Sequence, residues 1–320
     1  MTMAALQIIG IVLAGLIILT VLFIAGVALY NRIMLKKEAA VFAQPLGTSV
    51  EVDGHRMCVY AKGEGRHTLV FLAGSGNTCP ILDLKSIYSH LDNDHRIVVI
   101  EKFGYGMSDV VDTERSFGTI IRQDREALEK AGIEGPFILC PYSMSGVQAL
   151  RWAQLYPEEV EGIAGIDMAV PQTYDTIEDR LKKAEKTYRF ISFLRMSGLI
   201  RLIPDRKVVP VDELTKDEAS VYRKIFNARM CNITVQREGE GIAKVRDDIR
   251  KVPLPSVPMI LMVSNGQGTG DDEKTWRGFS TSFAKDNKNI ETIGLTCGHG
   301  LEGQSRTIAE NIRSFSERLS

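Results

Sequence analysis

The stretch Phe137-Ile-Leu-Cys-Pro-Tyr-Ser-Met-Ser-Gly-Val-Gln-Ala-Leu150 decides the fold. It begins as an apolar, strand-like run, turns sharply at Tyr142-Ser143-Met144, and leaves as a helix-like run over residues 147–155. A serine on such a strand–turn–helix corner forms a nucleophile elbow, which exposes the hydroxyl at the edge of a sheet. Ser143 is therefore the candidate nucleophile.

The elbow departs from the usual pattern. That pattern is G-x-S-x-G, because the tight turn leaves room only for small residues on either side of the serine. Here Pro141 and Ser145 stand where the glycines would be, and Gly146 follows. Ser145 is small enough to fit, and Pro141, with φ fixed near about −65°, is tolerable at the end of a strand. From these residues alone, a serine in an ordinary strand–helix loop stays the alternative.

Strand-like and helix-like segments alternate on both sides of the elbow. A hairpin-like pair comes first, at residues 49–54 and 57–60, and apolar strand-like runs follow at 68–72, 96–100, 137–140, 161–166, 257–263 and 290–294. Helix-like segments separate them, at 81–91, 117–131, 274–284 and 306–319. This alternation predicts an α/β fold built on a doubly wound, mostly parallel sheet.

Composition narrows the function classes. The chain has 320 residues, enough for one large domain with an accessory segment, and 39 basic against 40 acidic residues give a net charge of −1. Nothing in this balance points to nucleic acid. The five cysteines, at 58, 79, 140, 231 and 297, form no C-x-x-C pair, which argues against a disulfide framework or a zinc site. We expect Cys140 and Cys297 to act as small buried apolar residues.

The N-terminus predicts a membrane anchor. No charged side chain precedes Arg32, and residues 8–30 are apolar apart from glycines and Thr20. As a helix they span ~35 Å, enough for a bilayer core of ~30 Å. A cleaved signal peptide is the alternative, but it favours a basic start and a shorter apolar run of about 7–15 residues. We predict a transmembrane helix at 6–31 and a linker at 32–46.

Three basic residues indicate the orientation of this single-pass anchor. Arg32, Lys36 and Lys37 follow the apolar run directly. Since positive charge is enriched on the cytoplasmic side, we expect the C-terminal domain on that side of the membrane.

Residues 171–257 break the alternation. Two amphipathic, charge-rich segments at 176–193 and 217–230 predict helices, and no strand pattern is evident. We therefore predict a helical cap at 171–257 that divides the core into 47–170 and 258–320. In open α/β sheets, ligands bind at the carboxyl ends of the strands, where such an insertion would sit.

The order of the motifs carries a family resemblance. A strand leads into Ala73-Gly74-Ser75-Gly76, the next into Gly104-Tyr-Gly-Met-Ser-Asp109, then come the elbow and the insertion, and Gly298-His299-Gly300 precedes the last helix. Over residues 47–319 this order resembles the α/β-hydrolase superfamily, in particular its cap-bearing, membrane-anchored members from Gram-positive bacteria. The resemblance implies an eight-stranded sheet with a cap and a Ser-Asp/Glu-His triad in that chain order. It implies no cofactor and no metal.

The resemblance assigns roles to several residues. Ser143 would attack an acyl carbonyl, and His299 would take its proton and later protonate the leaving group. The backbone N–H groups of Met144 and, by its place in the glycine-rich loop, Ser75 would form the oxyanion hole. We expect the other four histidines to be surface or turn residues; they are His55, His67, His90 and His95.

Three aspartates compete for the acid of the triad. Relatives commonly carry it after the strand at 259–263, but Thr269 takes that place here, and Asp271 and Asp272 follow slightly late. Asp167 ends the strand before that one and looks similar to the acid of some cap-bearing dehalogenases. A buried carboxylate there needs a polar partner. We favour Asp167 and keep Asp271 and Asp272 as alternatives.

These features predict a membrane-anchored serine hydrolase, esterase- or lipase-like, that cleaves a small-molecule or lipid ester through an acyl-enzyme. Tyr142 is a candidate liner of the acyl pocket. A serine at the elbow argues against epoxide hydrolase and haloalkane dehalogenase chemistry, which needs a carboxylate nucleophile. Two alternatives stay open. One is a non-catalytic binding protein of the same fold. The other is a prolyl-aminopeptidase-like peptidase, which would need acidic cap residues such as Glu178, Asp179 or Glu185.

Overall fold

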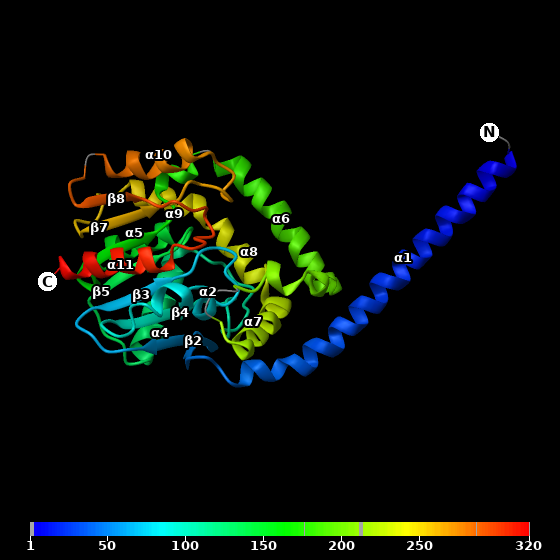
Figure 1. Cartoon of the computed structure of the whole chain (residues 1–320), viewed down its shortest axis with the longest axis horizontal. Helices are drawn as coiled ribbons and strands as arrows, with labels where there is room; N and C mark the ends of the chain where they lie inside the picture. The colour runs from blue at the N-terminus through cyan, green and yellow to red at the C-terminus, as the bar shows by residue number, and fades with distance from the viewer. Residues whose placement is uncertain (1–2, 176, 211–213, 286, 320) are drawn as a thin grey trace.

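The computed structural model describes residues 3–175, 177–210, 214–285 and 287–319, with the side chains of all of these except 177–183. Its centre is one eight-stranded sheet with the order β1-β2-β4-β3-β5-β6-β7-β8 (Figure 1). The strands are β1 (Thr48–Val52), β2 (His55–Lys62), β3 (Thr68–Leu72), β4 (Arg96–Glu101), β5 (Phe137–Pro141), β6 (Val160–Ile166), β7 (Met259–Val263) and β8 (Ile290–Gly294). The predicted fold class is confirmed.

The strand directions bring the site residues to one edge. Only β1 with β2 and β2 with β4 pair antiparallel, while the other pairs are parallel. The central strands are in register at their carboxyl ends, where Leu72 pairs with both Ile100 and Pro141. The loops after β3, β5 and β6 therefore meet at the same edge, as ligand-binding loops do in open parallel sheets.

Helices cover both faces of the sheet. Alternate side chains of β3 show this, because Val70 and Leu72 belong to one buried cluster while Leu69 and Phe71 belong to the other. The first cluster is covered by α4 (Phe117–Lys130), α5 (Ser145–Leu155), α9 (Ile242–Arg250) and α10 (Glu273–Ala284). The second is covered by α2 (Pro80–Asp83), α3 (Lys85–Tyr88) and α11 (Ser305–Glu317). The helix expected at 81–91 is thus two short helices, because the backbone of Leu84 leaves the helical region between them.

The insertion between β6 and β7 is helical where it is described. It contains η3 (Pro171–Tyr174), α6 (Ile177–Ser197), η4 (Leu199–Leu202), η5 (Asp205–Lys207), α7 (Lys216–Arg229), α8 (Ile233–Glu240) and α9. Figure 1 shows α6, α7 and α8 at the end of the molecule nearest α1, opposite the C-terminus. The last helix, α9, packs instead on α5 beside the sheet, through Ile242, Val245 and Ile249. The cap boundary at residue 257 stays a prediction.

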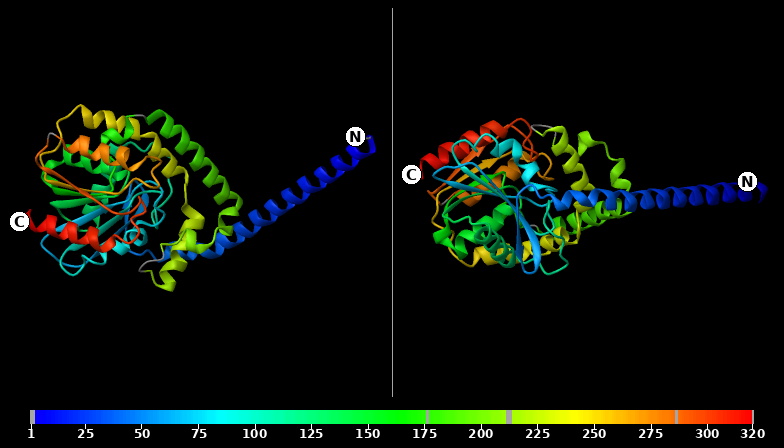
Figure 2. Two further views of the ribbon diagram at one scale, coloured as in Figure 1. Left: turned by 45° about the horizontal axis from the view of Figure 1, so that its top comes forward. Right: turned by 90° about the horizontal axis from the view of Figure 1, so that it is seen from below.

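The N-terminal helix, α1, runs from Met3 to Glu38 and projects from the rest of the chain (Figures 1 and 2). Within the described residues, it is the one helix long and apolar enough to cross a membrane, with a mean hydropathy of 3.1 in its most apolar window and none of that window buried. The linker expected at 32–46 stays a prediction, and most of this segment is helical. The helix continues to Glu38, and the 3-10 helix η1 (Ala39–Ala43) follows before β1. Contacts of Asn31 and Glu38 with the cap hold this end of α1 in place.

Candidate active site

The elbow is a strained turn between β5 and α5. Ser143 has a φ of +56°, a conformation that few residues other than glycine adopt. Strand-like pairing continues up to the serine, since the N–H of Tyr142 donates to the oxygen of Leu72 at 2.9 Å and that of Ser143 to the oxygen of Ile166 at 3.3 Å. The chain then enters α5 at Ser145. This turn leaves the Ser143 side chain half-buried at the sheet edge instead of inside the core.

Small residues make the turn possible. A Cβ on Gly74 would lie 2.6 Å from the Cβ of Ser143, and one on Gly146 would lie 2.2 Å from the oxygen of Ala169. Ser145 replaces a glycine and is accommodated because its hydroxyl contacts two carbonyl oxygens, Leu72 at 2.7 Å and Tyr142 at 2.9 Å. The departures from the usual pattern therefore leave the elbow geometry intact.

Ser143, His299 and Asp167 form a continuous hydrogen-bonded chain. The Nε2 atom of His299 lies 2.9 Å from the Oγ of Ser143, and its Nδ1 lies 2.6 Å from the Oδ2 of Asp167. An ionised carboxylate only accepts, so Nδ1 carries the proton and Nε2 is left to accept from the serine hydroxyl. This is the arrangement in which imidazole can act as a general base.

Asp167 is buried but fully engaged. Its Oδ1 accepts from the backbone N–H of Ser264 at 2.7 Å and from the indole N–H of Trp276 at 2.8 Å, while Oδ2 also accepts from the Ser264 hydroxyl at 2.7 Å. Burial alone would raise the pKa of Asp167. The hydrogen bond and charge of His299, together with the hydrogen bonds from Ser264 and Trp276, outweigh burial and hold this pKa below its ordinary value. The carboxylate therefore stays ionised at neutral pH.

Two aromatic rings fix the orientation of His299. Tyr142 stacks on the imidazole with 5.2 Å between ring centroids, and its hydroxyl donates to the backbone oxygen of His299 at 2.7 Å. Trp276 meets the imidazole edge-on at 5.6 Å. The sequence suggested Tyr142 only as a pocket liner and gave no signal for Trp276. Ser264 directly follows the apolar run of β7. This position at the end of a strand is the only sequence signal that could have indicated Ser264 as a partner of Asp167.

The other predicted residues lie in different settings. Asp272 is the N-cap of α10, where it accepts from the N–H of Thr275 at 2.8 Å. Asp271 lies in the same loop, where its backbone N–H donates to the Thr269 hydroxyl at 3.2 Å. His67 and His95 lie in bends directly before β3 and β4, as the turn alternative expected, but both are buried and face Glu161 and Ser316 respectively. Cys140 and Cys297 are free and buried, as expected, and burial raises the pKa of the Cys297 thiol to about 11.

The expected oxyanion loop lies against the serine. The close approach of Gly74 to Ser143 places Ser75 beside the elbow, and Met144 follows the serine directly. Within the described residues, neither the Ser75 nor the Met144 N–H donates a hydrogen bond, so both are available to a developing oxyanion. The Ser75 hydroxyl contacts the hydroxyl of Tyr188 on α6. The cap thus reaches the loop that would hold the oxyanion.

A buried polar network lies behind this loop. The ammonium of Lys102 pairs with the carboxylate of Glu238 on α8 and contacts the backbone oxygen of Ala73 at 3.3 Å. Tyr105 donates to the same carboxylate at 2.6 Å. Both charged side chains are only 1% exposed, and the ion pair joins residues 136 positions apart. It connects the cap to the oxyanion loop, and no sequence motif identified it.

Comparison with known proteins identifies the family. No protein-family model matches the chain. The chain is 35% identical over 270 residues to the uncharacterized protein YbdG of Bacillus subtilis (strain 168), a match that covers 80% of each chain. The chain belongs to the family of YbdG. A second relative, the uncharacterized protein C23C11.06c of Schizosaccharomyces pombe, is 32% identical over only 84 residues, 16% of its own length.

Solved structures show that the chain has the α/β-hydrolase fold. The haloalkane dehalogenase DbeA-M1 loop variant from Bradyrhizobium elkanii matches with a TM-score of 0.61 and 18% identity, over 85% of this chain and 96% of its own. A proposed epoxide hydrolase from Pseudomonas aeruginosa matches with a TM-score of 0.63 and 17% identity, over 85% and 95% of the two chains. At such low identity the likeness shows the shared fold and carries no substrate from one protein to the other.

Proposed function

We propose that the protein is a membrane-anchored serine hydrolase that cleaves an ester or related acyl bond. The observation that carries this proposal is the position of His299, whose two ring nitrogens lie 2.9 Å from the Ser143 hydroxyl and 2.6 Å from the Asp167 carboxylate. Nucleophile, base and orienting acid stand in hydrogen-bond reach, as a triad requires.

The chemistry proceeds in two halves. The Oγ of Ser143 forms a bond to the acyl carbon as Nε2 of His299 takes its proton, and the N–H groups of Ser75 and Met144 stabilise the tetrahedral oxyanion. The bond to the leaving alcohol then breaks, and His299 gives that alcohol its proton. A water molecule attacks the acyl-enzyme with the same base, which releases the acid and restores the serine. Asp167 holds the imidazole tautomer and stabilises the imidazolium without taking its proton.

The serine separates this chemistry from that of the structural relatives. Attack of an alkoxide on a haloalkane or an epoxide would leave an ether, which the same base and water cannot hydrolyse. Attack on an acyl carbon leaves an ester, which they can. The nucleophile therefore favours an acyl substrate over those named for the dehalogenase and the proposed epoxide hydrolase.

The peptidase alternative can be checked at one of its three acidic cap residues, Glu185, because only that side chain is described. Glu185 is exposed and pairs with Arg189 one helical turn along α6, at 3.5 Å. The side chains of Glu178 and Asp179 lie outside the described ones. Of the three acidic cap residues considered, only Glu185 has a described side chain, and it pairs with Arg189 instead of facing the serine, where it could bind a substrate amine.

We further propose that α1 is a retained single-pass anchor and that the domain lies on the cytoplasmic side. Its apolar window is exposed along its whole length, as expected of a lipid-facing helix. Arg32, Lys36 and Lys37 follow this window, and their positive charge favours the cytoplasmic side.

A fluorophosphonate probe tests the enzyme proposal. The full chain in detergent should react covalently, and Ser143→Ala and His299→Ala should lose the reaction while circular dichroism shows them folded. Reaction of the folded Ser143→Ala variant at the wild-type rate, or no reaction of the folded wild type between pH 6 and 9, would refute it.

A further inference from the structure

The exposed apolar side chains of the folded domain gather in one place. Outside α1, six large apolar side chains of the described residues are exposed, and four of them lie on α6 and η4. These four are Phe190 at 60%, Phe193 at 51%, Met196 at 69% and Leu202 at 62% exposed. We call them the cap patch. A monomeric soluble surface rarely concentrates its apolar side chains in this way.

The cap patch covers one side of α6, and the other side meets the active site. Phe190, Phe193 and Met196 are three residues apart, so they follow one stripe of the helix. Tyr188 and Ile191 point the other way: Tyr188 contacts the Ser75 hydroxyl, and Ile191 packs on the buried core. A single helix therefore separates the cap patch from the oxyanion loop.

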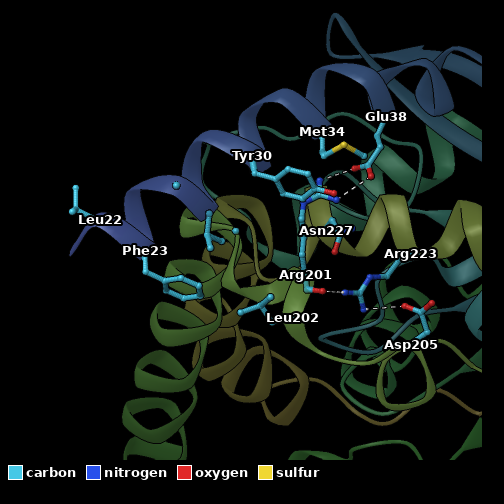
Figure 3. A pocket seen from close by; sticks show the side chains of 13 residues that line it. Leu22, Phe23, Tyr30, Met34, Glu38, Arg201, Leu202, Asp205, Arg223 and Asn227 are labelled. Carbon is cyan, nitrogen blue, oxygen red and sulfur yellow. Dashed lines mark hydrogen bonds and ion pairs between the residues drawn. The ribbon is translucent and has the colours of Figure 1, made fainter. Parts of the chain in front are cut away.

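The base of α1 is fixed directly to this part of the cap. Asn31, the one buried residue of α1, donates to the oxygen of Arg195 at 3.1 Å and accepts from the Nε of Arg201 at 2.7 Å. The guanidinium of Arg201 also binds the carboxylate of Glu38 at 2.9 and 2.7 Å (Figure 3). Gly198 allows the close approach, since a Cβ there would lie 2.6 Å from that of Asn31.

This junction sets the cap patch beside the lipid-facing part of α1. A groove of about 710 Å³ lies between α1 and the cap, with Leu22, Phe23 and Val27 on the α1 side. On the cap side Leu202 is the one cap-patch residue in its lining, beside the charged Arg201, Asp205 and Arg223. Figure 1 shows α6 running across the molecule to meet α1, whose N-terminal part projects beyond it, and Figure 2 shows the same meeting. Leu202 thus joins the exposed apolar surface of α1 to the cap patch.

Charged residues around the cap patch favour an anionic surface. Among the described side chains of α6 and η5, four basic ones are exposed against two acidic ones; the basic residues are Lys186, Arg189, Arg206 and Lys207, and the acidic ones are Glu185 and Asp205. Aromatic and aliphatic side chains bordered by Lys and Arg are the pattern of helices that lie in a membrane interface. The anionic cytoplasmic leaflet attracts such segments.

We infer that the cap patch rests in the headgroup–acyl boundary of an anionic bilayer, so that the active site receives acyl substrates directly from the membrane. The inference rests on the proposed anchor and hydrolase function and names the source of the substrate. The outer side of α6 would contact lipid, while its inner side holds the oxyanion loop through Tyr188. Long-chain acyl esters dissolved in the bilayer are therefore the substrate class.

Lipid contact can be measured without any assay of activity. The full chain carries one introduced cysteine labelled with an environment-sensitive fluorophore, in phosphatidylcholine–phosphatidylglycerol vesicles with or without doxyl-labelled lipid. The five native cysteines are buried. Phe193→Cys and Met196→Cys test the cap patch, Ile11→Cys reports insertion of α1, and Val252→Cys, 42% exposed and apolar, is the matched control.

Doxyl lipid should quench the fluorophore strongly at positions 11, 193 and 196, and little at 252. Quenching at 193 and 196 as weak as at 252, with position 11 quenched, would overturn the inference. A blue-shifted but unquenched signal at 193 and 196 would also overturn it, because a protein surface, such as a second copy, would then cover the cap patch. Absence of quenching at position 11 would refute the anchor and the inference together.

The substrate claim has its own test. A Phe190→Ser/Phe193→Ser variant should hydrolyse a long-chain ester in vesicles about tenfold more slowly than wild type, while its rate on a water-soluble short-chain ester stays unchanged. Equal loss on both esters would contradict membrane delivery. If the wild type cleaves neither ester and resists the fluorophosphonate, the hydrolase proposal fails, whereas the quenching result still decides lipid contact.

Discussion

The elbow and the α1–cap junction are both precise, but they are built differently. At the elbow, the backbone fixes Ser143: the positive φ, the approach of Gly74 and the bonds to Leu72 and Ile166 all come from adjoining strands and loops. At the junction, side chains fix α1: Asn31 and Glu38 bind Arg201, about 165 positions away in the chain. The first arrangement uses the backbone of neighbouring strands and leaves short motifs around Gly74 and Ser143 in the sequence, whereas the second depends on side chains and leaves no motif.

We expect the largest effect from a substitution that disturbs the backbone arrangement around Ser143. Gly74→Ala places a Cβ 2.6 Å from that of Ser143, so the loop or the elbow must shift. Loss of one oxyanion donor costs about 100-fold or more in rate, and we expect Gly74→Ala to slow fluorophosphonate labelling by about that factor. Gly118→Ala is the matched control, because nothing lies within 4 Å of a Cβ there. Equal labelling rates for the two variants would mean that the loop has no part in the reaction.

We expect a smaller effect from a substitution that removes side-chain contacts at the α1–cap junction. Arg201→Ala leaves the carboxylate of Glu38, only 13% exposed, without its cation. Removing one partner of a buried pair is destabilising, and we expect a local loss of about 2–3 kcal/mol. Amide exchange at residues 31–43 and 198–202 should speed by about 30- to 150-fold, while exchange around Ser143 stays unchanged.

Arg318→Ala is the control for that experiment. Its pair with Glu291 is equally short, at 2.8 Å, but both side chains are about half exposed. Such a surface pair contributes little. If the two arginine variants exchange alike, the junction is not held by Arg201.

A third change tests Glu101, a buried carboxyl group outside both the elbow and the α1–cap junction. It shows how a buried acid affects stability where no cation pairs with it directly, in contrast to Glu38 at the junction. Glu101 is fully buried at the end of β4, where it accepts from the N–H of Met107 at 2.7 Å, and burial raises its pKa from 4.5 to about 7. The folded state therefore binds an extra proton between about pH 4.5 and 7, so stability from this group falls as pH rises through that window. Glu101→Gln should flatten this dependence and gain on the order of 3 kcal/mol relative to wild type at pH 8. Denaturant unfolding between pH 5 and 8 measures it, with the exposed Glu129→Gln as control; parallel curves for wild type and Glu101→Gln would contradict the expectation.

The sequence predicted the fold, which the structure confirms, and it indicated Ser143 and His299 as candidate site residues, because both inferences depend on local patterns. Apolar runs marked the strands, and the Pro141–Ser145 corner and the Gly-His-Gly turn marked the elbow and His299. The choice among Asp167, Asp271 and Asp272 could only be ranked, since it depends on how two neighbouring strands align. The structure brings Asp167 to His299 and leaves Asp272 as a helix cap.

What the sequence could not predict consists of contacts between distant segments. Trp276 reaches Asp167 across 109 positions, and Lys102 reaches Glu238 across 136. Neither pair has a spacing that a helix or a strand would produce. The continuation of α1 through Lys36 and Lys37 to Glu38 was also missed, because helical propensity alone did not distinguish a rigid extension from a linker.

The most direct test of the account is the labelling rate of Asp167→Asn beside Asp271→Asn and Asp272→Asn, with peptide mapping of the fluorophosphonate adduct. The account predicts one adduct, on Ser143, and a fall of about 10³- to 10⁴-fold for Asp167→Asn, because an amide would orient the wrong imidazole tautomer. The other two variants should label at the wild-type rate. A wild-type rate for Asp167→Asn, or an adduct on another residue, would contradict the assignment of Ser143, His299 and Asp167 as one catalytic unit.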